Sequence, residues 1–320
     1  MRTVAWLVAL LLWTLVAGCD SGTSPDSGSA TQDGGSGRRF AVSYQTVDNP
    51  FFSALTKGLR SVIETQGDTL QVYDASFDAR IQTQQVSDMI QAQLDGVFLN
   101  PVNWKGIGRS LQQAKASNLP VIVVDAPVQD RNLVVTTVAS DNFAAGKLAG
   151  EAFCKKHPES AKVALLTLPV NKACRDRISG FKAALEGKAQ YTIVAEQHVG
   201  KGTTEAAHPL MQDILQRTPD LDAVFAINDP AALGCLRALE QAGKADDVTV
   251  LAVDGHAKAI EEVARGRMLG TSAQFPEEIG AAAAKAMYRH LEGQTVEPDI
   301  KIRVELIDSS NVQRFAKSGD

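Results

Sequence analysis

The sequence lacks both the basic excess of a nucleic-acid-binding protein and the long apolar runs of a membrane-embedded one. Lys and Arg number 32 against 37 Asp and Glu, giving a formal net charge of -5. A phosphate-binding surface needs clustered basic residues, so we expect no nucleic-acid partner. The longest apolar run, residues 4–17, has fourteen residues, whereas a membrane-spanning helix needs about 20. These absences, with 44% hydrophobic residues in a chain of 320, are typical of a soluble globular protein.

Motifs of catalysis and cofactor binding are also missing. The sequence contains no GxxxxGK[ST] loop, no GxGxxG after a strand, no HExxH and no GxSxG elbow. Its five histidines show no metal-ligand spacing. We therefore predict that the protein is not an enzyme, that it has no catalytic residue, and that it carries neither a cofactor nor a metal.

The first 38 residues have the composition of an export signal followed by a linker. A basic Arg2, a short apolar segment and small residues before Cys19 are typical of a secretory signal, and Val16-Ala17-Gly18-Cys19 resembles the lipobox of bacterial lipoproteins. We predict a lipoprotein signal peptide over 1–18 and a lipid anchor on Cys19; the alternative is an ordinary signal whose cysteine is incidental. Residues 19–38 are rich in Ser and Gly and predict a flexible tether with a span of roughly 20 to 25 Å. The protein is therefore expected in the periplasm or on the cell surface, attached to a membrane.

From residue 39 onward, short apolar runs alternate with amphipathic stretches. Nine runs predict strands, at 40–44, 70–73, 96–99, 121–124, 163–168, 192–195, 223–227, 248–253 and 270–273. They contain mostly Val, Ile, Leu and Ala, as parallel strands buried on both faces do. A helix is predicted between them from Pro50, with Asn49 as its cap, an apolar stripe through Leu55 and Leu59, and Gly67 at its end. The pattern indicates an α/β protein.

A weak internal repeat places matching polar residues after matching strands. The segment DGVFLN, ending at Asn100, is echoed by DAVFAIN, ending at Asn228, and VIVVD, ending at Asp125, is echoed by VLAVD, ending at Asp254. The amide and the carboxylate are 25 positions apart in the first half and 26 in the second. Ligands of open α/β sheets bind beyond the carboxyl ends of the strands, so we expect all four groups in one cleft. The alternative is that these residues only form turns after their strands.

Amides and carboxylates together suit a neutral ligand rich in hydroxyl groups. A hydroxyl both donates and accepts, Asp only accepts, and Asn or Gln does both, so the two residue types can satisfy a pair of hydroxyls. Phe51 and Phe52 begin the first helix and could cover the apolar face of a sugar ring, with Phe51 the better ligand candidate and Phe52 the better core candidate. His256, two residues after Asp254, either lines the cleft or forms a turn.

From about Phe40 to Leu306 the chain resembles the type I periplasmic binding proteins of ABC transporters, and among them the ribose-type sugar-binding proteins. The resemblance rests on motifs that are specific together and in this order: Asp48-Asn49-Pro50-Phe51-Phe52, Asn100-Pro101, Ala139-Ser140-Asp141-Asn142, Arg175-Asp176-Arg177 with Gly180-Phe181, Asn228-Asp229, Val253-Asp254-Gly255 and Ala273-Gln274. It implies two doubly wound parallel-sheet lobes joined by a three-segment hinge. The N-terminal lobe is expected over 39–140 and 275–299, the C-terminal lobe over 141–274 and 300–312, with crossings near 140–141, 274–275 and 299–300.

The resemblance also implies a ligand site and a mode of action. The expected ligand-binding residues are Gln45, Asn49, Phe51, Phe52, Asn100, Asp125, Asp141, Arg177, Asn228, Asp254 and Gln274. Hinge closure around a monosaccharide or polyol is expected to precede docking on an ABC permease in the membrane, and we expect a monomer. Three residues, Ala126, Lys201 and Val253, depart from the ribose-type pattern, which indicates a polyhydroxy ligand other than ribose. Trp104 either supplies a stacking wall or packs within its loop.

Two other function classes remain open from the residues alone. One is a sensory receptor that presents sugar to a membrane signalling partner, and the other is an exported sugar hydrolase.

Three cysteines remain after Cys19. Because Cys154 is expected at the end of one helix and Cys174 at the start of another, we predict that these two and Cys235 are free and mostly buried thiols.

Overall fold

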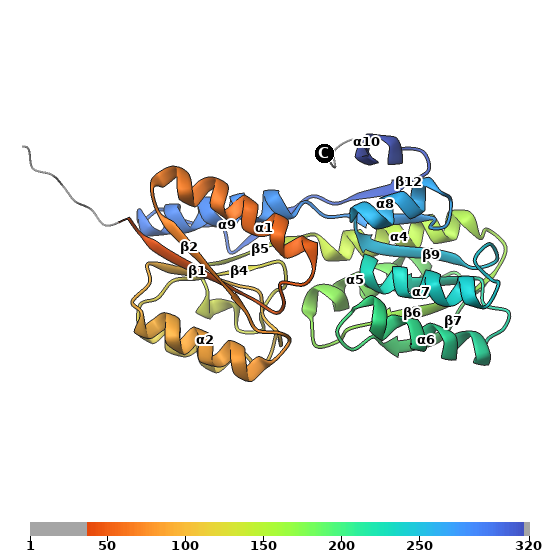
Figure 1. Ribbon diagram of the computed structural model, residues 1–320, viewed down its shortest axis with the longest axis horizontal. Coiled ribbons are helices and arrows are strands. Elements are labelled where there is room, and N and C mark those ends of the chain that lie inside the picture. The colour runs from red at the N-terminus through yellow and green to blue at the C-terminus, as the bar shows by residue number, and fades with distance from the viewer. Residues whose placement is uncertain (1–36, 317–320) are drawn as a thin grey trace, which may run out of the picture. The chain divides into compact units, whose positions relative to one another are not determined.

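The computed structural model describes residues 37–316, so the predicted signal peptide, Cys19 and most of the predicted tether lie outside the described residues. The described chain forms two six-stranded sheets, each covered by helices (Figure 1). We call each sheet with its helices a lobe. Among the described residues, no helix is long and apolar enough to cross a membrane.

The first lobe contains a wholly parallel sheet in the order β11-β5-β4-β3-β1-β2. Its strands are β1 (Arg39–Tyr44), β2 (Thr69–Asp74), β3 (Gly96–Leu99), β4 (Val121–Val124), β5 (Thr136–Ser140) and β11 (Asp299–Ile302). Its helices are α1 (Pro50–Ile63), α2 (Ala79–Gln91), α3 (Gly108–Ala116) and α9 (Pro276–Leu291), with short turns η1 (Glu64–Gln66) and η2 (Arg131–Leu133).

The second lobe repeats this plan in the order β12-β10-β9-β8-β6-β7, with only β12 antiparallel. Its strands are β6 (Ala161–Thr167), β7 (Tyr191–His198), β8 (Ala223–Ala226), β9 (Thr249–Asp254), β10 (Gly270–Ala273) and β12 (Glu305–Asp308). Its helices are α4 (Asn142–Lys156), α5 (Lys172–Leu185), α6 (Thr204–Arg217), α7 (Asp229–Gln241), α8 (Ala257–Ala264) and α10 (Val312–Ala316). The predicted fold, two doubly wound α/β lobes, is confirmed.

All nine predicted strands are present, and three strands were missed: β5, β11 and β12. One expected crossing differs from the structure. The chain was expected to enter the second lobe at 299–300, but Asp299–Ile302 pairs with β5 of the first sheet and Glu305–Asp308 pairs with β10 of the second. The third crossing is therefore at Arg303 and Val304. The sequence did not predict β11 as an edge strand because polar residues alternate with isoleucine in its Asp-Ile-Lys-Ile segment.

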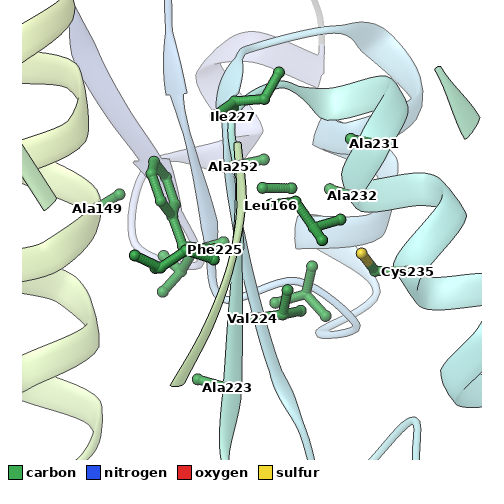
Figure 2. Close-up of a cluster of buried hydrophobic side chains, with 14 of the residues drawn as sticks. Ala149, Leu166, Ala223, Val224, Phe225, Ile227, Ala231, Ala232, Cys235 and Ala252 are labelled. Carbon is green, nitrogen blue, oxygen red and sulfur yellow. The ribbon is translucent and has the colours of Figure 1, made fainter. Parts of the chain in front are cut away.

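The cores lie where the apolar strands predicted them. In the second lobe, alternate residues of β8 face opposite helix layers, with Phe225 on the side of Ala149 of α4 and Val224 on the side of Cys235 of α7 (Figure 2). Phe225 stacks on Phe181 of α5 at a centroid distance of 4.5 Å. Burial of both faces explains why these strands carry almost no polar side chain.

The first helix begins and ends as predicted. The Asn49 side chain accepts a hydrogen bond from the Phe51 backbone, and Pro50 occupies the first turn. The apolar stripe through Leu55 and Leu59 is fully buried. At the other end Gly67 has a φ of 77°, a left-handed conformation that glycine adopts without strain.

In each lobe, glycines let one pair of helices pack closely. A Cβ on Gly58 of α1 would lie 2.1 Å from the Glu277 carbonyl oxygen of α9. In the second lobe, a Cβ on Gly146 of α4 would lie 1.8 Å from the Arg177 carbonyl oxygen of α5. Both distances are far below van der Waals contact, so the helix pairs require glycine at these positions. In Figure 1, α1 and α9, from opposite ends of the sequence, lie side by side.

The prediction for the cysteines is confirmed for the three that the structure describes. Cys154, Cys174 and Cys235 are free thiols, and Cys174 and Cys235 are buried. Burial raises the pKa of Cys174 and of Cys235 to about 12, so neither thiol ionises near neutral pH.

Candidate functional site

A pocket of about 280 Å³ is lined by residues of both lobes. Its polar floor comes from the segments that follow strands β1, β4, β8, β9 and β10, the edge where ligands bind in doubly wound sheets. Its volume is near the lower end of the ~300–1,000 Å³ typical of small-molecule sites, so it suits a ligand of monosaccharide size.

Nine of the eleven predicted ligand-binding residues line this one pocket. They are Gln45, Asn49, Phe51, Phe52, Asp125, Arg177, Asn228, Asp254 and Gln274. The structure thus brings together residues that are up to 229 positions apart, from Gln45 to Gln274. Their contact with a ligand stays a prediction.

The two repeat-related aspartates share an unusual backbone conformation. Asp125 has a φ of 64° and Asp254 a φ of 140°, although neither is glycine. Residues other than glycine rarely adopt positive φ, and such positions concentrate at functional sites. Both side chains are only 5% exposed. In each lobe an aspartate with positive φ therefore stands at the carboxyl end of a strand, directly after β4 in the first lobe and as the last residue of β9 in the second.

Asn100 lies beneath the pocket floor. It does not line the pocket, but its Nδ2 donates to Asp125 Oδ2 at 2.9 Å and its Oδ1 accepts from the Gln45 backbone at 3.2 Å. Asn100 is fully buried, so it acts by holding Asp125 and the end of β1 in place.

Arg177 is the buried cation of the site. The residue is 4% exposed, and its side chain is hydrogen-bonded within the second lobe. Its Nε donates to Asn142 Oδ1 at 2.8 Å, and its Nη1 donates to the Ile227 carbonyl at 2.7 Å and to Asp254 Oδ1 at 3.2 Å. Its Nη2 forms no hydrogen bond within residues 37–316, which leaves one edge of the guanidinium available to a ligand.

Gln274 and His256 lie on two sides of Asp254. Gln274 Nε2 donates to Asp254 Oδ1 at 2.8 Å, while its Oε1 is buried without a partner in the described chain. His256 Nε2 lies 3.7 Å from Asp254 Oδ2. His256 does not line the pocket and stands at the N-cap position of α8, so its turn interpretation agrees with its position.

Two buried carboxyls have raised pKa values. Burial raises the pKa of Asp125 to about 6; Arg177 opposes the shift, and Asp254 adds to it. Burial, together with the charge of Asp254, raises the pKa of Asp229 to about 7. Asp229 is fully buried behind the pocket, where it accepts from Thr271 Oγ1 at 2.6 Å and from the His256 backbone at 2.7 Å.

Two predicted ligand-binding amides also serve as helix caps. Asn49 caps α1, as described above, and Asn228 caps α7 by accepting from the Ala231 backbone at 3.0 Å. Asn228 Nδ2 donates to the Gly202 carbonyl at 2.9 Å, so both of its polar atoms already have partners. The turn-forming alternative for Asn therefore accounts for these contacts, whereas it does not account for the buried Asp125.

Asp141 and Trp104 do not line this pocket. Asp141 lines a different cavity beside the crossings, where its Oδ1 caps α4 and its Oδ2 accepts from Lys301 at 3.0 Å. Asp141 follows β5, where the chain crosses into α4, and both of its carboxylate oxygens have partners there. Trp104 lines that other cavity too and lies between Lys105 and Arg175 instead of forming a stacking wall.

The sequence reasoning missed Phe77 as the aromatic of the pocket wall. Phe77 follows β2, has a φ of 60°, and lies under Lys201 Nζ at 5.5 Å from the ring centroid. Asn171 of the second lobe also reaches the site, donating to Gln45 Oε1 at 3.4 Å across the two lobes. Phe77 lies in the loop after β2, so it belongs to no helical or strand pattern of apolar residues that the sequence could reveal.

Comparisons with known proteins agree with this geometry. The family described as "Periplasmic binding protein domain" matches residues 40–295. The ribose import binding protein of Bacillus subtilis is 33% identical over 308 residues, covering 95% of this chain and 98% of its own, and that of Escherichia coli K12 is 32% identical over 268 residues, covering 83% and 89%. An ABC transporter solute-binding protein of Mycobacterium smegmatis, solved with bound glycerol, superposes with a TM-score of 0.82 at 31% identity, covering 87% of this chain and 96% of its own.

The match spans most of the chain and most of each relative, and the relatives are solute-binding proteins, not enzymes. The chain therefore belongs to the periplasmic binding protein family, in its type I, ribose-type branch.

Proposed function

We propose that this protein is the substrate-binding subunit of an ABC importer and that it binds a monosaccharide or similar polyhydroxy compound in the pocket between its lobes. One observation carries the proposal: carboxylate, amide and guanidinium groups from both lobes line a single pocket that also contains Phe51 and Phe77. Such a lining suits hydroxyl groups on one part of the ligand and an apolar ring face on another.

The names of relatives support the ligand class. Curated relatives import ribose, and one of Escherichia coli that is 27% identical binds D-allose. A solved solute-binding protein of Bacillus halodurans holds myo-inositol, with a TM-score of 0.82 at 25% identity, covering 89% of this chain and 99% of its own. These ligands share a small ring and several hydroxyls, which is the chemistry that this pocket favours.

Ligand binding is coupled to closure of the two lobes. Asp125 belongs to the first lobe and Arg177 to the second, so a ligand that bonds to both stabilises only the arrangement in which they face it together. The chain passes between the lobes three times, and the crossings after Ser140, Ala273 and Ile302 are the hinge segments. The closed, loaded protein then docks on the permease.

The N-terminal residues attach the protein, as a monomer, to the membrane. Lipidated Cys19 and the tether over 19–38 keep it near the permease and raise its effective concentration there. Replacement of Cys19 by Ser should move the protein from the membrane fraction to the soluble fraction, whereas Cys154→Ser should leave it in the membrane. Membrane retention of Cys19→Ser would refute the lipid anchor.

A ligand screen tests the proposed function. We expect a monosaccharide, polyol or nucleoside to raise the melting temperature, because a ligand at about 100 times its Kd adds about 2.7 kcal/mol to the free energy of unfolding. If no hydroxyl-rich compound stabilises the protein, the ligand class is wrong. If a ligand binds but its uptake into cells is unchanged by deletion of the protein, that result favours the sensory receptor over the importer subunit.

A further inference from the structure

The pocket contains more carboxylates than cations. Its lining includes four carboxylates and two cations, namely Asp48, Asp125, Glu205 and Asp254 against Arg177 and Lys201. The excess is present at two levels. Asp125, Asp254 and Arg177 are buried at the floor, whereas Asp48, Glu205 and Lys201 are exposed at the mouth. Two acids therefore accompany one base at each level.

At the floor, Arg177 is committed to Asp254, and Asp125 has no cation of its own. The Arg177–Asp254 ion pair is buried, with N and O 3.2 Å apart. Asp125 Oδ2 accepts from the neutral amide of Asn100 at 2.9 Å, and Asp125 Oδ1 accepts no hydrogen bond within the described chain. Burial raises its pKa to about 6, with Arg177 lowering and Asp254 raising it, as expected of a carboxylate whose charge is only partly compensated.

Two further acceptors of the floor are unsatisfied, whereas the unpartnered His256 Nε2, 3.7 Å from Asp254 Oδ2, belongs to a residue outside the pocket lining. Gln274 Oε1 and Asp254 Oδ2 are buried without hydrogen-bond partners, and both residues are 5% exposed. Gln274 Nε2 donates one hydrogen bond to Asp254 Oδ1, whereas Oε1 has no donor in the described chain. A buried acceptor without a donor is costly, so the floor favours a ligand that brings donors.

Neither a metal ion nor Lys201 supplies hydrogen-bond donors and positive charge to the floor of the pocket. Residues 37–316 contain no group of three or more His, Cys, Asp or Glu side chains arranged to hold a metal. Lys201 Nζ lies over the Phe77 ring, 5.5 Å from its centroid, and the lysine is exposed at the mouth. The missing positive charge is therefore one that the ligand can supply.

We propose that the ligand is a hydroxylated compound that carries a protonated amino group, such as an amino sugar or an amino polyol, and that Asp125 binds this ammonium. The proposal rests on the proposed function and narrows its ligand class. An ammonium has three donors and no acceptor, which matches a floor with free acceptors. A hydrogen bond between ionised groups is also stronger than one between neutral groups. The hydroxyls would meet the free donors at the edges, such as Arg177 Nη2.

Calorimetric titration with matched ligands tests this proposal at pH 7, where Asp125 is largely ionised. The series contains serinol and glycerol, and D-glucosamine, D-glucose and N-acetyl-D-glucosamine, so that each amine has a neutral counterpart of similar shape. We expect at least one amine to bind about tenfold or more tightly than its counterparts. In Asp125→Asn, which keeps the shape and removes the charge, this preference should fall below about threefold, while Asp213→Asn, at an exposed position of α6 outside the pocket lining, should preserve it.

The other outcomes separate the inference from the proposed function. If neutral sugars bind as tightly as the amines or more tightly, the ammonium is wrong and the sugar-binding function stands. If the amines are preferred equally by Asp125→Asn, the assignment to Asp125 is wrong. If no compound of a broad sugar, polyol and amino-sugar screen binds, the proposed function fails, and the inference fails with it.

Discussion

Asn100 Nδ2 donates to Asp125 Oδ2 across the ends of β3 and β4, with the two atoms 2.9 Å apart. The contact joins two residues that the internal repeat had marked 25 positions apart. It favours the ionised form of Asp125 in a place where burial opposes ionisation. The hydrogen bond thus acts on the charge of Asp125 together with burial and the charges of Arg177 and Asp254, which have larger effects.

Replacement of Asn100 by Ala should raise the pKa of Asp125 above its value of about 6, because the hydrogen bond that favours the carboxylate is lost. It should also lower the free energy of unfolding by about 1 to 3 kcal/mol, since the Gln45 backbone loses its acceptor. The pKa is measured by NMR titration of the carboxyl carbon, and stability by urea denaturation. An unchanged pKa would mean that the hydrogen bond has no electrostatic role.

Asp125→Asn should stabilise the unliganded protein at pH 8 by up to roughly 3 kcal/mol, from a shift of about two pKa units. The sign follows from burial. The folded pKa of about 6 lies above the ordinary value of 3.8, so the native state binds the proton more tightly, and ionised Asp125 destabilises the fold above about pH 6. That cost is removed as the pH falls from about 6 toward 4.

The difference in unfolding free energy between wild type and Asp125→Asn should accordingly shrink over this interval. The charged groups that act on Asp125, Arg177 and Asp254, are present in both proteins, as is Asp229, so the comparison isolates one carboxyl. A constant difference between pH 4 and 8 would contradict the raised pKa. Denaturant unfolding at several pH values provides the measurement.

Asn228→Ala should destabilise the unliganded protein by about 1 kcal/mol, because the variant loses the cap of α7. Asn228→Ser is the matched control, since serine also caps helices but has no amide to donate to the Gly202 carbonyl. If ligand affinity falls in both variants and stability only in Asn228→Ala, the amide has a binding role beyond its cap.

Gly146→Ala should lower both stability and ligand affinity. Its Cβ would overlap the Arg177 carbonyl, so α5 must move and carry the buried guanidinium with it. Overpacking of this kind costs about 1 to 3 kcal/mol. Gly58→Ala, at the corresponding helix contact of the first lobe, should cost about as much stability while leaving Arg177 in place. Equal losses of affinity in the two variants, measured by calorimetry, would show that α4–α5 packing does not position Arg177.

Phe77→Asn should weaken ligand binding without destabilising the protein. Asparagine tolerates a φ of 60° better than phenylalanine, so the unliganded protein should keep or gain up to about 1 kcal/mol of stability. The ring that lines the pocket, however, is lost. Thermal denaturation and ligand titration of the same preparation separate the two effects. Loss of stability with unchanged affinity would assign Phe77 a purely structural role.

The fold was largely predictable because its buried strands are short apolar runs. β5 escaped because three of its five residues are Thr or Ser, although all five are buried in the structure. β11 and β12 escaped because each of these four-residue edge strands contains two charged residues, alternating in β11 and at the two ends of β12. What periodicity detects is burial of apolar side chains, so it fails where polar side chains are buried or where an edge strand is half exposed.

The site was predictable where the repeat marked it and less so elsewhere. Asn100, Asp125, Asn228 and Asp254 follow equivalent strands, and the structure brings them to the pocket or directly beneath it. The same reasoning placed Asp141 in the pocket, but its carboxylate caps α4 and accepts a hydrogen bond from Lys301 beside a different cavity. The burial of Arg177 depends on hydrogen-bond partners in three segments that are distant in the sequence, so the local sequence pattern could not predict it.

The close contact between α1 and α9 has a consequence for biosynthesis. About 210 residues separate the end of α1 from the start of α9, so the ribosome needs roughly 10 to 40 s to deliver the second helix after the first. The apolar stripe of α1 packs partly on α9. During this interval the N-terminal half cannot complete its core and stays exposed to the cellular factors that bind nascent chains.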